Sequence, residues 1–217
     1  MSKALSILQQ APMVPVIALQ DLNQAVPLAE ALVRGGLPVL EITLRTPAGL
    51  PAIRAIADAV PGAIVGAGTV RNPADFRAAI DAGSEFVITP GITQATLDAA
   101  ATTDVPLIPG IATASELMLA MDHGLHTLKF FPAEASGGAA ALKALAGPFP
   151  EVRFCPTGGI GMHNLTDYLD LPTVITVGGS WVMPQALLDS GDWDGIATRA
   201  REVVRVIDEH ARRKPGN

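Results

Sequence analysis

The sequence predicts a fold of the α/β class, a single (β/α)8 barrel preceded by one additional helix at the N-terminus. Three observations carry this prediction. Short runs of β-branched and aliphatic residues occur eight times along the chain, and alanine-rich segments separate them. Glycine, proline or threonine follows most of these runs. Strict alternation of strand and helix, repeated in this way, is typical of a closed parallel barrel.

The eight apolar runs are the predicted strands, and their composition suits burial on both faces. They cover residues 14–18, 39–42, 63–66, 85–88, 105–108, 127–130, 152–155 and 174–177. Helical patterns with polar residues near their starts lie between them, with clear examples at residues 23–34, 72–82 and 113–123. A charged amphipathic helix is predicted after Asp192, and we expect the tail, residues 212–217, to be disordered.

An open, doubly wound sheet is the alternative fold. Such a sheet usually carries a Gly-x-Gly-x-x-Gly turn after its first strand, whereas Leu19-Gln20-Asp21-Leu22 stands there in this sequence. The closed barrel is therefore preferred. A chain of 217 residues without a low-complexity insert is expected to form one domain, residues 1–217.

Composition narrows the class of function. The formal net charge of −6 and the lack of a basic stripe argue against nucleic acid as a partner. The single cysteine, Cys155, excludes an intramolecular disulfide, and its apolar neighbours predict a buried thiol. Histidine and cysteine show no zinc-like spacing, and no apolar run has the length of a membrane span. Because the N-terminus also lacks the features of a signal peptide, we expect a cytoplasmic protein.

Lys129 is the first candidate for chemistry. It lies in the sixth predicted strand among apolar residues, and no carboxylate follows it in the sequence before Glu134. Burial disfavours the charged ammonium, so such a lysine tends to become a neutral nucleophile suited to Schiff-base formation with a carbonyl compound. Strand alternation places Thr127, Lys129 and Phe131 on one face, where Phe131 would exclude water. A lysine at a strand end that reaches solvent is the alternative, and the apolar neighbours weigh against it.

Glu41 and Arg45 supply the second signal. Alternation along the second predicted strand points Glu41, Thr43 and Arg45 inward. A carboxylate in a barrel mouth is a candidate general acid/base, and an arginine offers a planar fork for a substrate carboxylate. A structural ion pair between Glu41 and Arg45 would leave the same pattern, so the functional reading depends on the presence of Lys129.

Two glycine pairs follow the seventh and eighth predicted strands, at Gly158-Gly159 and Gly178-Gly179. Glycine lets backbone N–H groups approach an anion, and (β/α)8 barrels commonly bind phosphate at these two loops. Tight turns also select glycine, but two pairs at both expected loops favour a phosphate site. Residues 66–69 are too weakly constrained to be specific, although Thr69 offers a hydroxyl contact.

Seven short motifs then point to one family. They are EITLRT (41–46), GAGTV (66–70), TPG (89–91), LIPGI (107–111), KFFPAE (129–134), FCPTGGI (154–160) and VGGSW (177–181). Together they resemble the class I 2-keto-3-deoxy-6-phosphogluconate (KDPG) aldolases, which are (β/α)8 lyases of the Entner–Doudoroff pathway. The resemblance extends from about Ser6 to beyond Trp181, and no functional position departs from it.

The resemblance implies a role for each candidate. Lys129 would form the Schiff base, Glu41 would act as general acid/base through a water, and Arg45 and Thr69 would bind the substrate carboxylate. The remaining positions are phosphate-binding Gly158, Gly159, Gly178, Gly179 and Ser180, and pocket-lining Pro90, Phe131 and Thr157. The resemblance also implies a homotrimer that uses no cofactor or metal. It would cleave KDPG, a small-molecule substrate, to pyruvate and glyceraldehyde 3-phosphate, with a side activity on 4-hydroxy-2-oxoglutarate (KHG).

Three rival functions remain open at this point. A related aldolase for the phosphogalactonate epimer or a non-phosphorylated hydroxy-keto-acid would share Lys129 and Glu41, but the glycine loops and Ser180 favour a phosphorylated substrate. A phosphosugar isomerase or epimerase would not need Lys129. A catalytically silent phosphate-binding barrel would keep Glu41 and Arg45 only as an ion pair. The family resemblance disfavours the last two, which the fold alone does not exclude.

Overall fold

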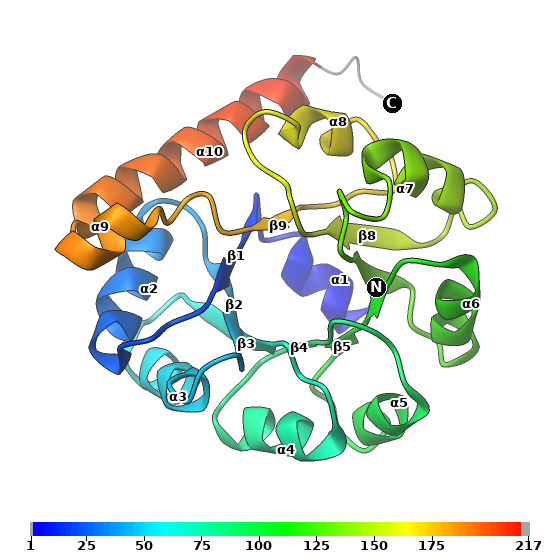
Figure 1. Cartoon of the computed structure of the whole chain (residues 1–217), viewed down its shortest axis with the longest axis horizontal. Coiled ribbons are helices and arrows are strands. Elements are labelled where there is room, and N and C mark those ends of the chain that lie inside the picture. The colour runs from blue at the N-terminus through cyan, green and yellow to red at the C-terminus, as the bar shows by residue number, and fades with distance from the viewer. Residues whose placement is uncertain (1, 214–217) are drawn as a thin grey trace.

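The chain folds into a ring of parallel strands surrounded by helices, as Figure 1 shows. The computed structural model describes residues 2–213. The strands within these residues are β1 (Val14–Ile17), β2 (Val39–Thr43), β3 (Ile64–Gly68), β4 (Val87–Ile88), β5 (Leu107–Ile108), β6 (Gly110–Ile111), β7 (Thr127–Phe130), β8 (Arg153–Pro156) and β9 (Gly178–Gly179). All the strand pairs among them are parallel. The predicted α/β barrel is therefore confirmed.

The ring closes through two junctions. β5 and β6 lie on either side of Pro109, which has no N–H for the ladder, and they pair with β4 and β7 respectively. β5 lies within the predicted strand 105–108, whereas β6 lies beyond it, after the proline at which that strand was expected to end. At the second junction an isolated bridge between Thr157 and Gly178 joins the end of β8 to β9, which in turn pairs with β1.

Helices alternate with the strands, and those from α2 onward form the outer layer in Figure 1, whereas α1 lies across the ring of strands. They are α1 (Lys3–Leu8), the 3₁₀ turn η1 (Leu22–Gln24), α2 (Ala25–Arg34), α3 (Gly49–Ala59), α4 (Pro73–Asp81), α5 (Gln94–Ala100), α6 (Ala114–Asp122), α7 (Gly138–Ala146), α8 (Leu165–Leu169), α9 (Gln185–Ser190) and α10 (Trp193–Arg213). Local sequence explains several starts. Asn72 caps α4 ahead of Pro73, and Thr113 forms a capping box with Glu116 at the start of α6.

The last predicted strand is wrong in its position. Residues 174–177 form only an isolated bridge at Val174, and the strand itself is β9, the glycine pair that had been placed in a loop. The reason is the register with β1, in which Val14 lies opposite Gly178. The predicted disordered tail also begins too early, because Arg212 and Arg213 belong to α10, while residues 214–217 lie outside the described residues.

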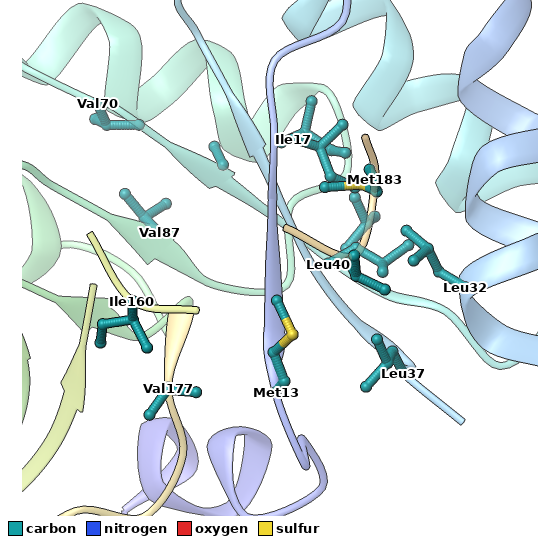
Figure 2. Close-up of a cluster of buried hydrophobic side chains, with 14 of the residues drawn as sticks. Met13, Ile17, Leu32, Leu37, Leu40, Val70, Val87, Ile160, Val177 and Met183 are labelled. Carbon is teal, nitrogen blue, oxygen red and sulfur yellow. The ribbon is translucent and has the colours of Figure 1, made fainter. Parts of the chain in front are cut away.

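Two apolar clusters fill the structure. The larger one lies between strands and helices, and Figure 2 shows a part of it that includes Ile17, Leu32 and Leu40. The smaller one lies inside the ring and joins α1 to the strands. Its members are Ala4, Ile7, Leu8, Ala11, Val14, Val39, Phe86, Ile88, Ile108 and Cys155. Because Val14 and Val39 are the first residues of their strands, α1 covers the amino-terminal end of the barrel and leaves the carboxyl-terminal end for a site.

Phe86 fills the barrel interior because Gly66 lacks a side chain. The Phe86 ring is fully buried, and a Cβ atom built on Gly66 would lie 2.5 Å from it. That distance is far below a van der Waals contact. The glycine in β3 is therefore a packing requirement of the inner cluster.

We expect Gly66→Ala to lower the free energy of unfolding by about 1–3 kcal/mol, because the added methyl group overpacks the interior. Gly91→Ala is the matched control, since a Cβ atom there would meet nothing within 4 Å. Urea denaturation followed by circular dichroism measures both. Equal stability of the two variants would contradict this account of Gly66.

Candidate active site

Lys129 and Glu41 meet inside the barrel. Nζ of Lys129, on β7, donates hydrogen bonds to Oε1 and Oε2 of Glu41, on β2, at 2.9 and 3.3 Å. Both residues are almost completely buried, at 4% and 2% exposure. The predicted inward direction of both side chains is confirmed. The lysine is not without a carboxylate, however, because its partner comes from a strand 88 positions earlier in the sequence.

The aromatic ring of Phe131 lies over the lysine. Its centroid is 5.2 Å from Nζ of Lys129, within the range of a cation–π contact. This placement agrees with the strand alternation of residues 127, 129 and 131. Phe131 therefore shields one side of the nitrogen from water.

Gly68, which is not among the predicted site residues, makes the space that Glu41 occupies. A Cβ atom on Gly68 would lie 2.2 Å from Oε1 of Glu41. Only glycine at this position in β3 lets the carboxylate lie where Lys129 reaches it. The available signal was the pair of glycines two positions apart, Gly66 and Gly68, which share one face of a strand.

Arg45 and Thr69 lie together beyond the ends of β2 and β3. Nε of Arg45 donates a hydrogen bond to Oγ1 of Thr69 at 3.2 Å. Thr69 adopts φ of +59°, and it is the only non-glycine residue between positions 2 and 213 with positive φ. Such a conformation is costly for a β-branched residue and is often found at functional sites. Glu41 pairs with Lys129, so the alternative of a Glu41–Arg45 ion pair does not hold.

The turn after β8 exposes backbone donors. Gly158 and Gly159 have φ of +106° and +78°, a succession of conformations that side chains rarely adopt. Their N–H groups, and that of Ser180 after β9, donate to no acceptor among residues 2–213. Consecutive unengaged N–H groups of this kind form a nest that suits an anion.

The other predicted site residues differ in how buried they are and in what they contact. Thr157 is buried, and its Oγ1 would lie 2.3 Å from a Cβ atom on Gly178, so Gly178 serves close packing inside β9. Gly179 is covered by the Trp181 ring, 1.9 Å from a Cβ atom built there. Pro90 is exposed after β4, where its carbonyl group lies against Gly110. The structure thus gives Gly178 and Gly179 a packing role that the sequence did not predict.

A cavity of about 360 Å³ is lined by β1, by the segment that follows it, and by residues 180–189. Arg45 and Ser180 both line it, whereas Lys129 and Glu41 do not. Asp21 and Asp189 also line it and were not identified from the sequence. The cavity therefore brings one predicted carboxylate-binding residue, Arg45, and one predicted phosphate-binding residue, Ser180, to a common space.

Cys155 lies next to Lys129 across the β7–β8 ladder. Burial raises the pKa of its thiol to about 12, and the neighbouring Glu41 carboxylate adds to this rise while the Lys129 ammonium opposes it. The predicted buried thiol is confirmed, at 2% exposure. A thiol in this state is a neutral packing group.

Side chains that could hold a metal do not gather in the described part of the chain, where no group of three or more His, Cys, Asp or Glu residues has a suitable arrangement. None of the helices between residues 2 and 213 combines the length and the apolar character needed to cross a bilayer.

Comparison with known families decides between the rival barrels. The family model of KDPG and KHG aldolases matches residues 5–199. The chain belongs to this family of aldolases. The KHG/KDPG aldolase of Escherichia coli K12 is 57% identical over 203 residues, which cover 94% of this chain and 95% of the relative. The 2-dehydro-3-deoxy-phosphogluconate aldolase of Pseudomonas aeruginosa is 50% identical and covers 95% of this chain and 94% of its own length.

Solved structures agree with this membership. The KDPG aldolase of Legionella pneumophila, captured with pyruvate as a covalent carbinolamine, has a TM-score of 0.90 at 44% identity, covering 93% of this chain and 98% of its own. The Zymomonas mobilis enzyme with 3-phosphoglycerate has a TM-score of 0.88 at 46% identity, covering 93% and 95%. An isomerase, an epimerase or a catalytically silent barrel is therefore set aside.

We expect Cys155 in the folded aldolase to resist a thiol reagent such as DTNB at about pH 8, because a thiol of pKa about 12 is almost entirely protonated there. Unfolding in guanidinium should expose one reactive thiol, since the chain has one cysteine. Reactivity of the folded protein should rise only as the pH rises toward the thiol pKa. Rapid labelling of the native protein near neutral pH would be inconsistent with a buried, protonated thiol.

Proposed function

We propose that this protein is a class I aldolase that cleaves KDPG to pyruvate and glyceraldehyde 3-phosphate, with a further activity on KHG. The observation that carries the proposal is the contact of the Lys129 amine with the Glu41 carboxylate at 2.9 Å inside the barrel. It supplies a nucleophile and a proton acceptor in direct contact, which Schiff-base chemistry requires. Family membership and the names of the relatives support the same activity.

The first half of the reaction uses this contact. Transfer of the Lys129 ammonium proton to Glu41 frees the nitrogen lone pair, which adds to the C2 carbonyl carbon of the substrate. The resulting carbinolamine loses its hydroxyl group as water when Glu41 returns a proton, directly or through a water. The product is a protonated imine between Lys129 and C2. The carbinolamine of the Legionella relative with pyruvate supports this sequence.

The second half breaks the carbon–carbon bond. Glu41 accepts the proton of the C4 hydroxyl group, the C3–C4 bond breaks, and its electron pair moves into the protonated imine to form an enamine. The aldehyde leaves, C3 of the enamine is protonated, and water releases pyruvate from Lys129. Every proton that leaves the substrate is thus accepted and returned by one carboxylate.

Substrate binding divides between two ends of the site. Arg45 and Thr69 lie at the rim, where the guanidinium can pair with the carboxylate next to the reacting carbonyl group. The unengaged N–H groups of Gly158, Gly159 and Ser180 suit the phosphate at the other end. The relative from Zymomonas mobilis that holds 3-phosphoglycerate supports a phosphorylated ligand.

Sequence identity to relatives of different substrate names indicates which related substrate this protein prefers. The relative named KHG/KDPG aldolase is 57% identical to this chain, whereas a solved structure named KDPGal is 27% identical at a TM-score of 0.84. This difference favours the gluconate-derived substrate over its galactonate epimer. A role in the Entner–Doudoroff pathway, a cytoplasmic location, a homotrimer and action without a metal or cofactor complete the proposal, and they rest on the family resemblance.

Incubation with pyruvate followed by borohydride reduction should leave a 1-carboxyethyl group on Lys129, because borohydride reduces the imine to a stable secondary amine. Peptide mass spectrometry after proteolysis locates the adduct. Lys143, which is exposed on α7, is the internal control and should stay unmodified. Absence of any adduct would exclude the imine mechanism.

We expect Glu41→Gln to lower kcat for KDPG cleavage by about 10²- to 10⁴-fold, since the amide can accept no proton. The glutamine has nearly the same shape, so the space beside Gly68 stays filled. A coupled assay that reduces the released pyruvate measures the rate, and Glu30→Gln, an exposed glutamate on α2, is the matched control. A rate for Glu41→Gln within a factor of about two of wild type would remove Glu41 from the proton transfers.

A further inference from the structure

The loop after β7 is bonded to the glycine turn after β8. The Ala133 N–H donates to the Thr157 carbonyl at 2.8 Å, and the Glu134 N–H donates to the Gly158 carbonyl at 3.0 Å. These bonds continue the β7–β8 ladder beyond the strands. Backbone hydrogen bonds therefore connect the glycine turn to the segment that carries Lys129, which lies five residues before Glu134.

The Glu134 side chain covers this turn and is itself held by the single tyrosine of the chain. A Cβ atom on Gly159 would lie 2.6 Å from Cγ of Glu134, so the side chain packs directly on the glycine. Oε1 of Glu134 accepts a hydrogen bond from the Tyr168 hydroxyl. Tyr168 lies on α8 and is fully buried. A carboxylate of the β7–α7 loop is thus fixed to the helix that follows the turn.

Asn164 holds the same turn from its far side. Its Nδ2 donates to the Gly159 carbonyl at 3.2 Å, and its Oδ1 accepts from the Gly161 N–H at 2.9 Å. The carbonyl groups of Gly158 and Gly159 are therefore engaged, while their N–H groups are not. The turn is fixed in an orientation that leaves donors available.

The phenol of Tyr168 is suited to a permanent donor role. Its pKa is raised well above the ordinary value, first by burial and then by the hydrogen bond to Glu134. The hydroxyl proton consequently stays in place over the whole range in which the enzyme would work. A carboxylate acceptor makes the bond charge-assisted and stronger than one between neutral groups.

We propose that the Glu134–Tyr168 hydrogen bond positions the Gly158–Gly159 turn for the substrate phosphate and so sets the preference for phosphorylated over non-phosphorylated keto-acids. This inference rests on the proposed aldolase function. Glu134 and Tyr168 are positioning residues, because they act through the turn and not on the reacting atoms. Their loss affects the binding of the phosphate and leaves the imine chemistry of Lys129 intact.

KDPG and KHG together test the inference, because both react at the same carbonyl group but KHG has no phosphate. In Tyr168→Phe and Glu134→Ala, we expect KM for KDPG to rise about tenfold, the effect of a lost charge-assisted hydrogen bond. KM for KHG should change less than about twofold, and kcat for both substrates should be preserved. Glu134→Gln keeps an acceptor oxygen of similar size and should restore KM for KDPG to within about threefold of wild type.

The control variant is Thr166→Ala, an exposed residue on the same short helix, which should leave both KM values unchanged. Equal losses for KDPG and KHG, or an unchanged KM for KDPG in Glu134→Ala, would overturn the inference. Glu134 has an exposed side chain, so its two variants decide the matter even if Tyr168→Phe fails to fold. Borohydride trapping of pyruvate distinguishes failure of the aldolase function from failure of the positioning role. If the wild-type protein traps no pyruvate, the aldolase function is refuted. If trapping is normal but KM changes equally for KDPG and KHG, only the positioning role is refuted.

Discussion

The buried contact between Lys129 and Glu41 is the interaction on which the rest of the site depends. Two charged groups inside a barrel are tolerated because each one compensates the other, and neither would be stable there alone. The contact joins β2 to β7 across the interior, so it exists only when the ring of strands is closed. The short distance between the Lys129 nitrogen and the Glu41 carboxylate compensates both charges. It also allows the proton transfer between them that Schiff-base chemistry requires.

The surrounding residues can be understood by their distance from this contact. Gly68 leaves room for the carboxylate, and Phe131 shields the amine. Further out, Arg45 with Thr69 and the Gly158–Gly159 turn offer donors for the two anionic ends of the substrate. Helix α1 fills the opposite end of the barrel with apolar side chains. Apolar side chains therefore fill the interior at the amino-terminal end of the barrel, and a surrounding without water strengthens electrostatic effects at the contact.

Much of this arrangement could be predicted from residue patterns, and the failures have identifiable physical causes. Period-two alternation correctly pointed Glu41 and Lys129 inward, but it could not pair them, because pairing depends on how the ring closes. The composition of residues 174–177 predicts a strand there, whereas hydrogen bonding with β1 selects Gly178 and Gly179. The role of Gly68 was missed because a glycine shows its purpose only when the side chain that fills its space is known. The contact of Glu134 with Tyr168 is likewise invisible in the sequence, since it joins a loop to a helix 34 residues away.

A double-mutant cycle on the free energy of unfolding, with Lys129→Met, Glu41→Gln and the double variant, tests the Lys129–Glu41 contact most directly. Our account predicts that Lys129→Met alone costs about 3–5 kcal/mol because it leaves an uncompensated buried carboxylate. The double variant should then cost clearly less than the sum of the two single losses, with a coupling energy in the upper part of the roughly 0.5–3 kcal/mol range of contacting residues. Additive losses, within about 0.5 kcal/mol, would show that the two side chains do not interact in the folded protein and would contradict the account.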